Sequence, residues 1–205
     1  MKTTSSKKIL RFDALERAVH WLVAITFIYA ALSGLSMWSR KLFWISSVLG
    51  GGVTVRYMHP LVALIFAAAF LRMFFKWASQ MKLDADDRVW LANSHKYAMN
   101  QEDGLEVGKF NGGQKMMFWM QALFTVLLLV SGVVLWFPES MPRALRLIAV
   151  LIHPLAAIGA IGGIIIHIYM GTAAVPGSIK AMVRGVVSPR WAAAHHRKWF
   201  REQQR

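Results

Sequence analysis

The sequence predicts an all-α integral membrane protein, a bundle of four transmembrane helices with both termini in the cytoplasm. Three observations support this fold class. The 205 residues are 56% hydrophobic with a mean hydropathy of +0.42, which is typical of a membrane protein. Four apolar runs are each long enough to cross a bilayer as a helix. The basic residues gather on one side of these runs.

We expect the four spans at about 19–38, 53–77, 114–137 and 145–172. Together they form a transmembrane domain (18–172) between a cytoplasmic N-terminus (1–17) and a basic cytoplasmic tail (173–205) with an amphipathic part at 179–187. The charged start and first apolar run also describe a signal peptide, but this run is long for one, so we expect it to be retained as a signal-anchor. Pro154 is expected to kink the fourth helix.

The distribution of charge predicts the orientation. Eighteen of the 24 Lys and Arg residues lie in the N-terminus, the tail, or the long polar loop 78–113 with its flanks, and five lie in the two opposite connectors. The positive-inside rule therefore places both termini in the cytoplasm. The net charge of +14 is explained by topology and anionic lipid, and a nucleic-acid binder is set aside because the chain has no soluble basic domain.

The chain has no cysteine. This excludes disulfides, iron–sulfur clusters held by thiolates, and covalently attached c-type haem. A redox cofactor in this chain must be held by histidine or by packing.

Four histidines fall within the apolar runs. His153 and His167 lie on the fourth span, fourteen residues and almost four turns apart, so they leave the same face about 21 Å apart along the axis. His20 opens the first span at the cytoplasmic end, and His59 lies near the outer end of the second. With this topology only His59 with His153, and His20 with His167, match in depth. The pattern predicts two bis-histidine haem sites, an outer and an inner one.

Each of these residues also has a simpler interpretation. A single histidine inside a membrane is more often a structural residue or part of a proton relay than a haem ligand, and the same four could line a metal or proton transporter. Arg56 and Arg72 could pair with haem propionates or only extend to the membrane surface. His95, His195 and His196 lie in polar or basic segments, where we expect them to be solvated.

The segment 108–119 runs from a loop into the cytoplasmic start of the third span, at the depth of the inner histidine pair. Asn111 and Gln114 offer amide donors to a carbonyl group there, and Met and aromatic side chains supply an adaptable apolar wall. The same residues would equally serve as a helix cap and core.

The chain resembles the membrane cytochrome b (gamma) subunit of respiratory formate dehydrogenase. The resemblance covers nearly the whole chain, and its most specific part is the segment 108–119. The other residues that carry it are 17–21, 32–34, the His59–Pro60 pair, 151–153, 167–170, 177–180 and 195–202. Family members usually have Tyr and Ala where this chain has Phe110 and Gly112, which affects only details of the pocket.

The resemblance implies two haems b, with His59 and His153 on the outer iron and His20 and His167 on the inner one. It also implies a menaquinone or other quinone site involving Asn111, Gln114 and His167. The partners would be an Fe–S beta subunit and a molybdenum or tungsten alpha subunit that oxidises formate outside the bacterial inner membrane. The complex would form a higher oligomer.

We therefore interpret the chain as the electron-transfer and quinone-reducing subunit of a formate dehydrogenase-like respiratory complex, with formate oxidation on another subunit. The first alternative is the cytochrome b subunit of a membrane-bound hydrogenase or a similar quinone-linked oxidoreductase. The second is the histidine-lined transporter.

Overall fold

The computed structural model describes residues 8–99 and 105–205, without the side chains of residues 97 and 98. The start of the predicted cytoplasmic N-terminus and part of the predicted loop 78–113 (100–104) lie outside the described residues. The chain divides into two compact units. The first comprises 1–17, 77–119 and 164–205, and the second comprises 18–76 and 120–163.

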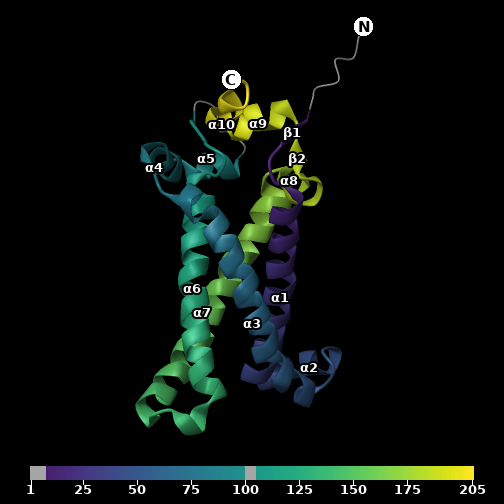
Figure 1. Cartoon of the computed structure of the whole chain (residues 1–205), viewed down its shortest axis with the longest axis vertical. Coiled ribbons are helices and arrows are strands. Elements are labelled where there is room, and N and C mark those ends of the chain that lie inside the picture. Colours follow the sequence, from purple (N-terminus) through teal and green to yellow (C-terminus); the bar gives the residue numbers. More distant parts are fainter. Residues whose placement is uncertain (1–7, 100–104) are drawn as a thin grey trace. The chain divides into compact units, whose positions relative to one another are not determined.

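Four long helices account for about half of the chain (Figure 1): α1 Ala14–Trp38, α3 Gly52–Trp77, α6 Gly112–Trp136 and α7 Arg143–Tyr169. All four are long and apolar enough to cross a membrane, which confirms the predicted helical membrane fold with four spans, while the cytoplasmic position of the termini stays a prediction. They begin at most five residues before the predicted spans and end within three residues of them. α7 continues through Pro154 as a single helix, and the predicted kink stays a prediction.

Large apolar side chains cover the outside of these helices. Ile25, Phe75 and Ile166 are each more than 60% exposed. Exposed apolar surface on this scale is costly in water but matches a hydrocarbon environment. Polar side chains on the helices bond back to their own backbone, as Thr26 does when its Oγ1 donates to the Leu22 carbonyl at 2.7 Å. The helix surfaces are thus built to face lipid.

The remaining elements are short. Between α1 and α3 lies α2 Trp44–Val48, and Gly50 and Gly51 after it both have positive φ angles that favour glycine. The polar loop contains α4 Ala85–Ala92 and α5 Ser94–Ala98. A π-helical turn, Met170–Ala174, follows α7. The tail then forms α8 Ser178–Arg184, α9 Pro189–His195 and α10 Arg197–Glu202.

The tail also pairs with the N-terminus inside the first unit. The strand β1, Ile9–Leu10, runs antiparallel to β2, Val186–Val187 (Figure 1). The Arg11 backbone N–H continues this contact by donating to the Gly185 carbonyl at 2.8 Å. The expected amphipathic segment 179–187 is therefore only partly helical. It ends in a strand, because the backbone of the N-terminus supplies a hydrogen-bonding partner.

α4 in the polar loop is anchored by buried charge. Asp84 and Asp87 form a reciprocal capping box at its start, with each carboxylate accepting from the other's backbone N–H. Lys115, near the start of α6, donates to the Asp87 carboxylate at 2.5 Å, and both residues are less than 10% exposed. This pair connects α4 to the segment 108–119.

Replacing Lys115 with Met would leave the Asp87 carboxylate buried without its cation, at a cost of roughly 3–5 kcal/mol. We expect a markedly lower thermal unfolding midpoint for the detergent-solubilised protein. The matched control is Lys198→Met, because the Lys198–Asp86 pair is about 40% exposed on both sides. Its loss should cost about 0.2–1 kcal/mol. Equal midpoints for the two variants would contradict this assignment.

Candidate functional site

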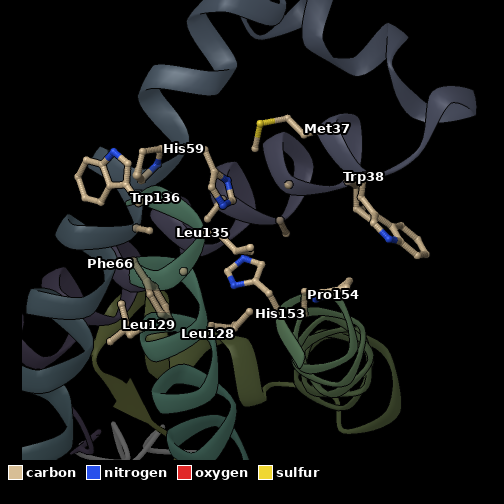
Figure 2. Close-up of a pocket in the computed structure, with 18 of the residues that line it drawn as sticks. Met37, Trp38, His59, Phe66, Leu128, Leu129, Leu135, Trp136, His153 and Pro154 are labelled. Carbon is tan, nitrogen blue, oxygen red and sulfur yellow. The ribbon is translucent and has the colours of Figure 1, made fainter. Parts of the chain in front are cut away.

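The second unit contains a cavity of about 950 Å³. Figure 2 shows its apolar wall, with Met37, Trp38, Phe66, Leu128, Leu129, Leu135 and Trp136 labelled, and α1, α3, α6 and α7 all contribute lining residues. Pockets for cofactors and drug-sized ligands usually measure about 300–1,000 Å³ and are mostly apolar. The cavity therefore has the size and character of a site for a large apolar ligand.

His59 on α3 and His153 on α7 both line this cavity (Figure 2). Their ring centres are 6.3 Å apart and the ring planes are inclined by 69°. Each histidine is followed by a proline inside a helix, Pro60 and Pro154. The structure thus brings together the two residues that the sequence pairs by depth as the outer site.

The spacing of the two rings fits a single metal ion between them. A metal–histidine nitrogen bond is about 2 Å long, and the centre of a five-membered ring with bonds of about 1.33 Å lies about 1.1 Å from each ring nitrogen. Two imidazoles on opposite sides of one iron would therefore have centres about 6.2 Å apart. The observed separation agrees with this value, so the two imidazoles are spaced as the two ligands of a bis-histidine haem would be.

Two glycines allow the helices to approach the rings. A Cβ atom at Gly34 on α1 would lie 3.2 Å from His59 Cε1, and one at Gly132 on α6 would lie 3.4 Å from His153 Cε1. The residue before each glycine, Ser33 or Ser131, has its Oγ within 2.9 Å of the Nδ1 atom of the same histidine. Each ring is therefore held against a Ser–Gly pair on the neighbouring helix.

The two arginines differ in their relation to the cavity. Arg56 lies on α3 and lines it, as a residue that binds a cofactor's carboxylates would. Arg72 lies further along α3, is exposed, and is not among the lining residues described for this cavity. Both propionate assignments stay predictions, and the geometry favours the one for Arg56.

His20 and His167 belong to different units. His20 lies on α1 in the second unit, is half-buried, and packs edge-to-face on Trp21 with ring centres 5.5 Å apart. His167 lies near the end of α7 in the first unit and is exposed. Their pairing stays a prediction from the sequence.

Asn111 and Gln114 form the N-terminal cap of α6. The Asn111 Oδ1 atom accepts from the Gln114 backbone N–H at 2.9 Å, and the Gln114 Oε1 atom accepts from the Asn111 N–H at 3.0 Å. This is the capping role that the sequence left open. Both bonds use the side-chain oxygens. Within the described part of the chain, no recorded hydrogen bond uses either side-chain NH₂ group, so the donor role stays open as well.

Gly112, one of the two departures from the usual family pattern, allows this cap to lie close to α4. A Cβ atom there would be 2.9 Å from the Asp87 carbonyl oxygen, and one at Gly113 would be 2.9 Å from the Trp90 ring. The smaller residue therefore fits a tight backbone contact in this chain.

His196 differs from the sequence expectation. We expected it to be solvated, but it is only 1% exposed, and its Nδ1–H donates to the Gly108 carbonyl at 2.6 Å. Arg11 donates to the next carbonyl, Lys109, at 2.8 Å, and the backbone N–H of Lys198 donates to the Val107 carbonyl at 3.0 Å. Three successive carbonyls before α6 are thus held by the two ends of the chain.

The other two histidines outside the spans were also expected to be solvated. His95 is exposed, as expected, whereas His195 is half-buried.

Burial, together with the nearby Arg11 guanidinium, lowers the pKa of His196 well below its ordinary value of 6.5. The folded protein therefore keeps this ring neutral at a pH where the unfolded chain binds a proton. As the pH falls below about 6.5, His196 lowers the stability of the fold by up to about 1.4 kcal/mol per pH unit.

We therefore expect His196→Asn, which retains an N–H donor near the position of Nδ1, to lose part of the acid destabilisation of the wild type. Thermal unfolding midpoints measured between about pH 8 and pH 5 would check this. His95→Asn is the control, because it makes the same substitution at an exposed histidine. Parallel profiles for the wild type and His196→Asn would show that His196 is not held neutral.

The four apolar helices and the histidine pair across an apolar cavity define a class: multi-pass membrane proteins that can hold a flat metal cofactor between two imidazoles. The family model described as prokaryotic cytochrome b561 matches residues 11–185, and the chain belongs to this family. Membership of a b-type cytochrome family implies haem b as the cofactor. The chain is thus a multi-pass protein of the bacterial inner membrane.

Curated relatives are similar to this chain over nearly its full length. In Escherichia coli strain K12, the formate dehydrogenase cytochrome b556(fdo) subunit is 39% identical over 198 residues, which cover 95% of this chain and 92% of the relative. The cytochrome b556(Fdn) subunit of the nitrate-inducible formate dehydrogenase of that strain is 38% identical, covering 97% and 93%. The formate dehydrogenase cytochrome b556 subunit of Haemophilus influenzae is 30% identical, covering 99% and 87%. These similarities confirm the resemblance seen in the sequence.

Proposed function

We propose that this chain is the dihaem cytochrome b subunit of a formate dehydrogenase complex, and that it delivers electrons to a quinone near the cytoplasmic side of the membrane. The observation that carries the proposal is the separation of 6.3 Å between the His59 and His153 rings at the wall of an apolar cavity. The names of the relatives, which are formate dehydrogenase subunits, support the choice of complex.

In this proposal His59 and His153 hold the outer haem, and His20 and His167 hold the inner one. Haem held by these histidines would supply one-electron transfer. The apolar side chains around His59 and His153 exclude water from the outer site. Arg56 at its wall would neutralise a propionate.

The candidate quinone site consists of Asn111, Gln114 and His167. The side-chain oxygens of the two amides cap α6, so their orientation is fixed and the NH₂ groups are the atoms left to bind a carbonyl. The hydrogen bonds from His196, Arg11 and the Lys198 backbone to the carbonyls of residues 107–109 hold the backbone just before Asn111. These bonds and the cap of α6 would together present the NH₂ donors in a fixed position.

The charge distribution supports the direction of transfer. With both termini inside, the His59–His153 site lies toward the outside, and segment 108–119 lies at the cytoplasmic end of α6. Electrons would enter from an Fe–S beta subunit beside a molybdenum or tungsten alpha subunit outside, and the quinone would take its protons from the cytoplasm. Inward electron movement with proton uptake inside charges the membrane. The complexes would assemble into a higher oligomer.

The first test is optical. We expect the purified chain to show b-type bands in its reduced-minus-oxidised spectrum and two haems per chain. His59→Ala should remove one haem and His20→Ala the other, because each removes one axial ligand of one site. A histidine-lined transporter would show no such bands. Simultaneous loss of both haems in either variant, or of neither, would contradict the proposed pairing.

The second test separates the two roles of the amides. Asn111→Asp and Gln114→Glu retain the side-chain oxygen that caps α6 but remove the NH₂ donor. In the intact complex we expect formate still to reduce both haems, while electron transfer to a menaquinone analogue falls at least about tenfold, as for the loss of about 1.4 kcal/mol.

Unchanged quinone reduction in both variants would exclude these amides from the site.

The soluble subunits that co-purify with the chain would distinguish a formate dehydrogenase from a hydrogenase.

A further inference from the structure

In the outer site, each of the two histidines contacts a Ser–Gly pair on a neighbouring helix. Ser33 and Gly34 on α1 contact His59, and Ser131 and Gly132 on α6 contact His153. The Ser33 Oγ lies 2.8 Å from His59 Nδ1, and the Ser131 Oγ lies 2.9 Å from His153 Nδ1. Both histidines precede a proline in the middle of a helix. The two halves of the site therefore present their rings in the same way.

The hydroxyl hydrogen of each serine is directed to its own helix. The Ser33 Oγ donates to the Tyr29 carbonyl at 2.7 Å, and the Ser131 Oγ donates to the Leu127 carbonyl at 2.6 Å. A hydroxyl has one hydrogen and two lone pairs, so an oxygen that donates to the backbone faces the imidazole with a lone pair. The bond to each ring is then Nδ1–H donating to Oγ.

A second acceptor lies beside each serine oxygen. The Ala30 carbonyl is 3.1 Å from the Ser33 Oγ, and the Leu128 carbonyl is 3.4 Å from the Ser131 Oγ. Because a carbonyl can only accept, either backbone contact uses the hydroxyl hydrogen and leaves an oxygen lone pair for the ring. A neutral imidazole protonated at Nδ1 has its lone pair on Nε2, the atom available to iron.

We propose that Ser33 and Ser131 are positioning residues of the outer haem, which fix the Nδ1–H tautomer of both axial ligands and set the potential of that haem. This proposal rests on the proposed function. A hydrogen bond from the remote ring nitrogen fixes the ring orientation and makes the ligating nitrogen more basic. More basic ligands stabilise ferric iron, so both serines lower the midpoint potential of the outer haem.

The alternative is that the serines only bond to their own helix. Two other residues of α1 do so, Ser36 to the Ser33 carbonyl at 2.8 Å and Thr26 to the Leu22 carbonyl at 2.7 Å, and among the residues that the structure describes neither hydroxyl bonds to a histidine. Ser36 is 1% exposed, close to the value for Ser33. Ser36→Ala is therefore a matched control that removes a buried backbone bond of the same type.

The experiment is a redox titration of both haems in the full chain, with the outer haem identified by its absence in His59→Ala. We expect Ser33→Ala and Ser131→Ala each to move the outer midpoint to a more positive potential and to leave the inner one unchanged. Haem affinity at the outer site should fall by about 10–100-fold. Ser131→Thr, which keeps the hydroxyl, should restore the wild-type midpoint, while Ser36→Ala should move neither.

If the outer haem of Ser33→Ala and Ser131→Ala has the same midpoint potential as that of Ser36→Ala, the positioning role is overturned. Equal shifts of the outer and inner midpoints in these two variants would overturn it as well. In each of these cases a wild-type chain with two haems would leave the proposed function standing. A wild-type chain without b-type bands would instead end the proposed function, and this inference with it.

Discussion

A histidine inside a hydrocarbon layer has two ring nitrogens, and each of them needs a partner, because an unpaired polar atom in that environment costs several kcal/mol. At His59 and His153 the structure supplies one of the two partners. Nδ1 faces a serine whose own hydrogen is bonded to the backbone. In the proposed function the other partner is an iron in the cavity, where the ring centres lie 6.3 Å apart. The features of the second unit that surround these two rings are consistent with this requirement.

The glycines next to the serines leave the imidazole rings enough space to reach their hydrogen-bond partners. A side chain at Gly34 or Gly132 would press on the imidazole ring, so the Ser–Gly pair supplies both an acceptor and the space to reach it. The prolines after the histidines each leave the helix with one fewer backbone donor, and α3 and α7 nevertheless continue through them. The apolar wall then surrounds a site whose polar contacts are few and directed.

In the first unit, the polar backbone groups of the loop before α6 also have specific partners. The carbonyls of residues 107–109 are held by His196, Arg11 and the backbone of α10. The Asp87–Lys115 pair and the cap on α6 fix the residues that follow. A segment expected to offer donors to a ligand is thereby held by contacts from both ends of the chain, which are distant in sequence.

The sequence by itself determined the class of protein, the four spans to within a few residues, and the family, because bilayer thickness fixes helix length and apolar composition is a local property. It also indicated which histidines share a depth, since the helix rise is constant.

Only the tertiary structure decided that His196 is buried, that Ile9–Leu10 pairs with Val186–Val187, and that the side-chain oxygens of Asn111 and Gln114 are used in a cap. It also decided which ring nitrogen of His59 and His153 faces a serine. Each of these depends on a neighbour brought close by packing, and hydrophobic periodicity carries no information about such a neighbour.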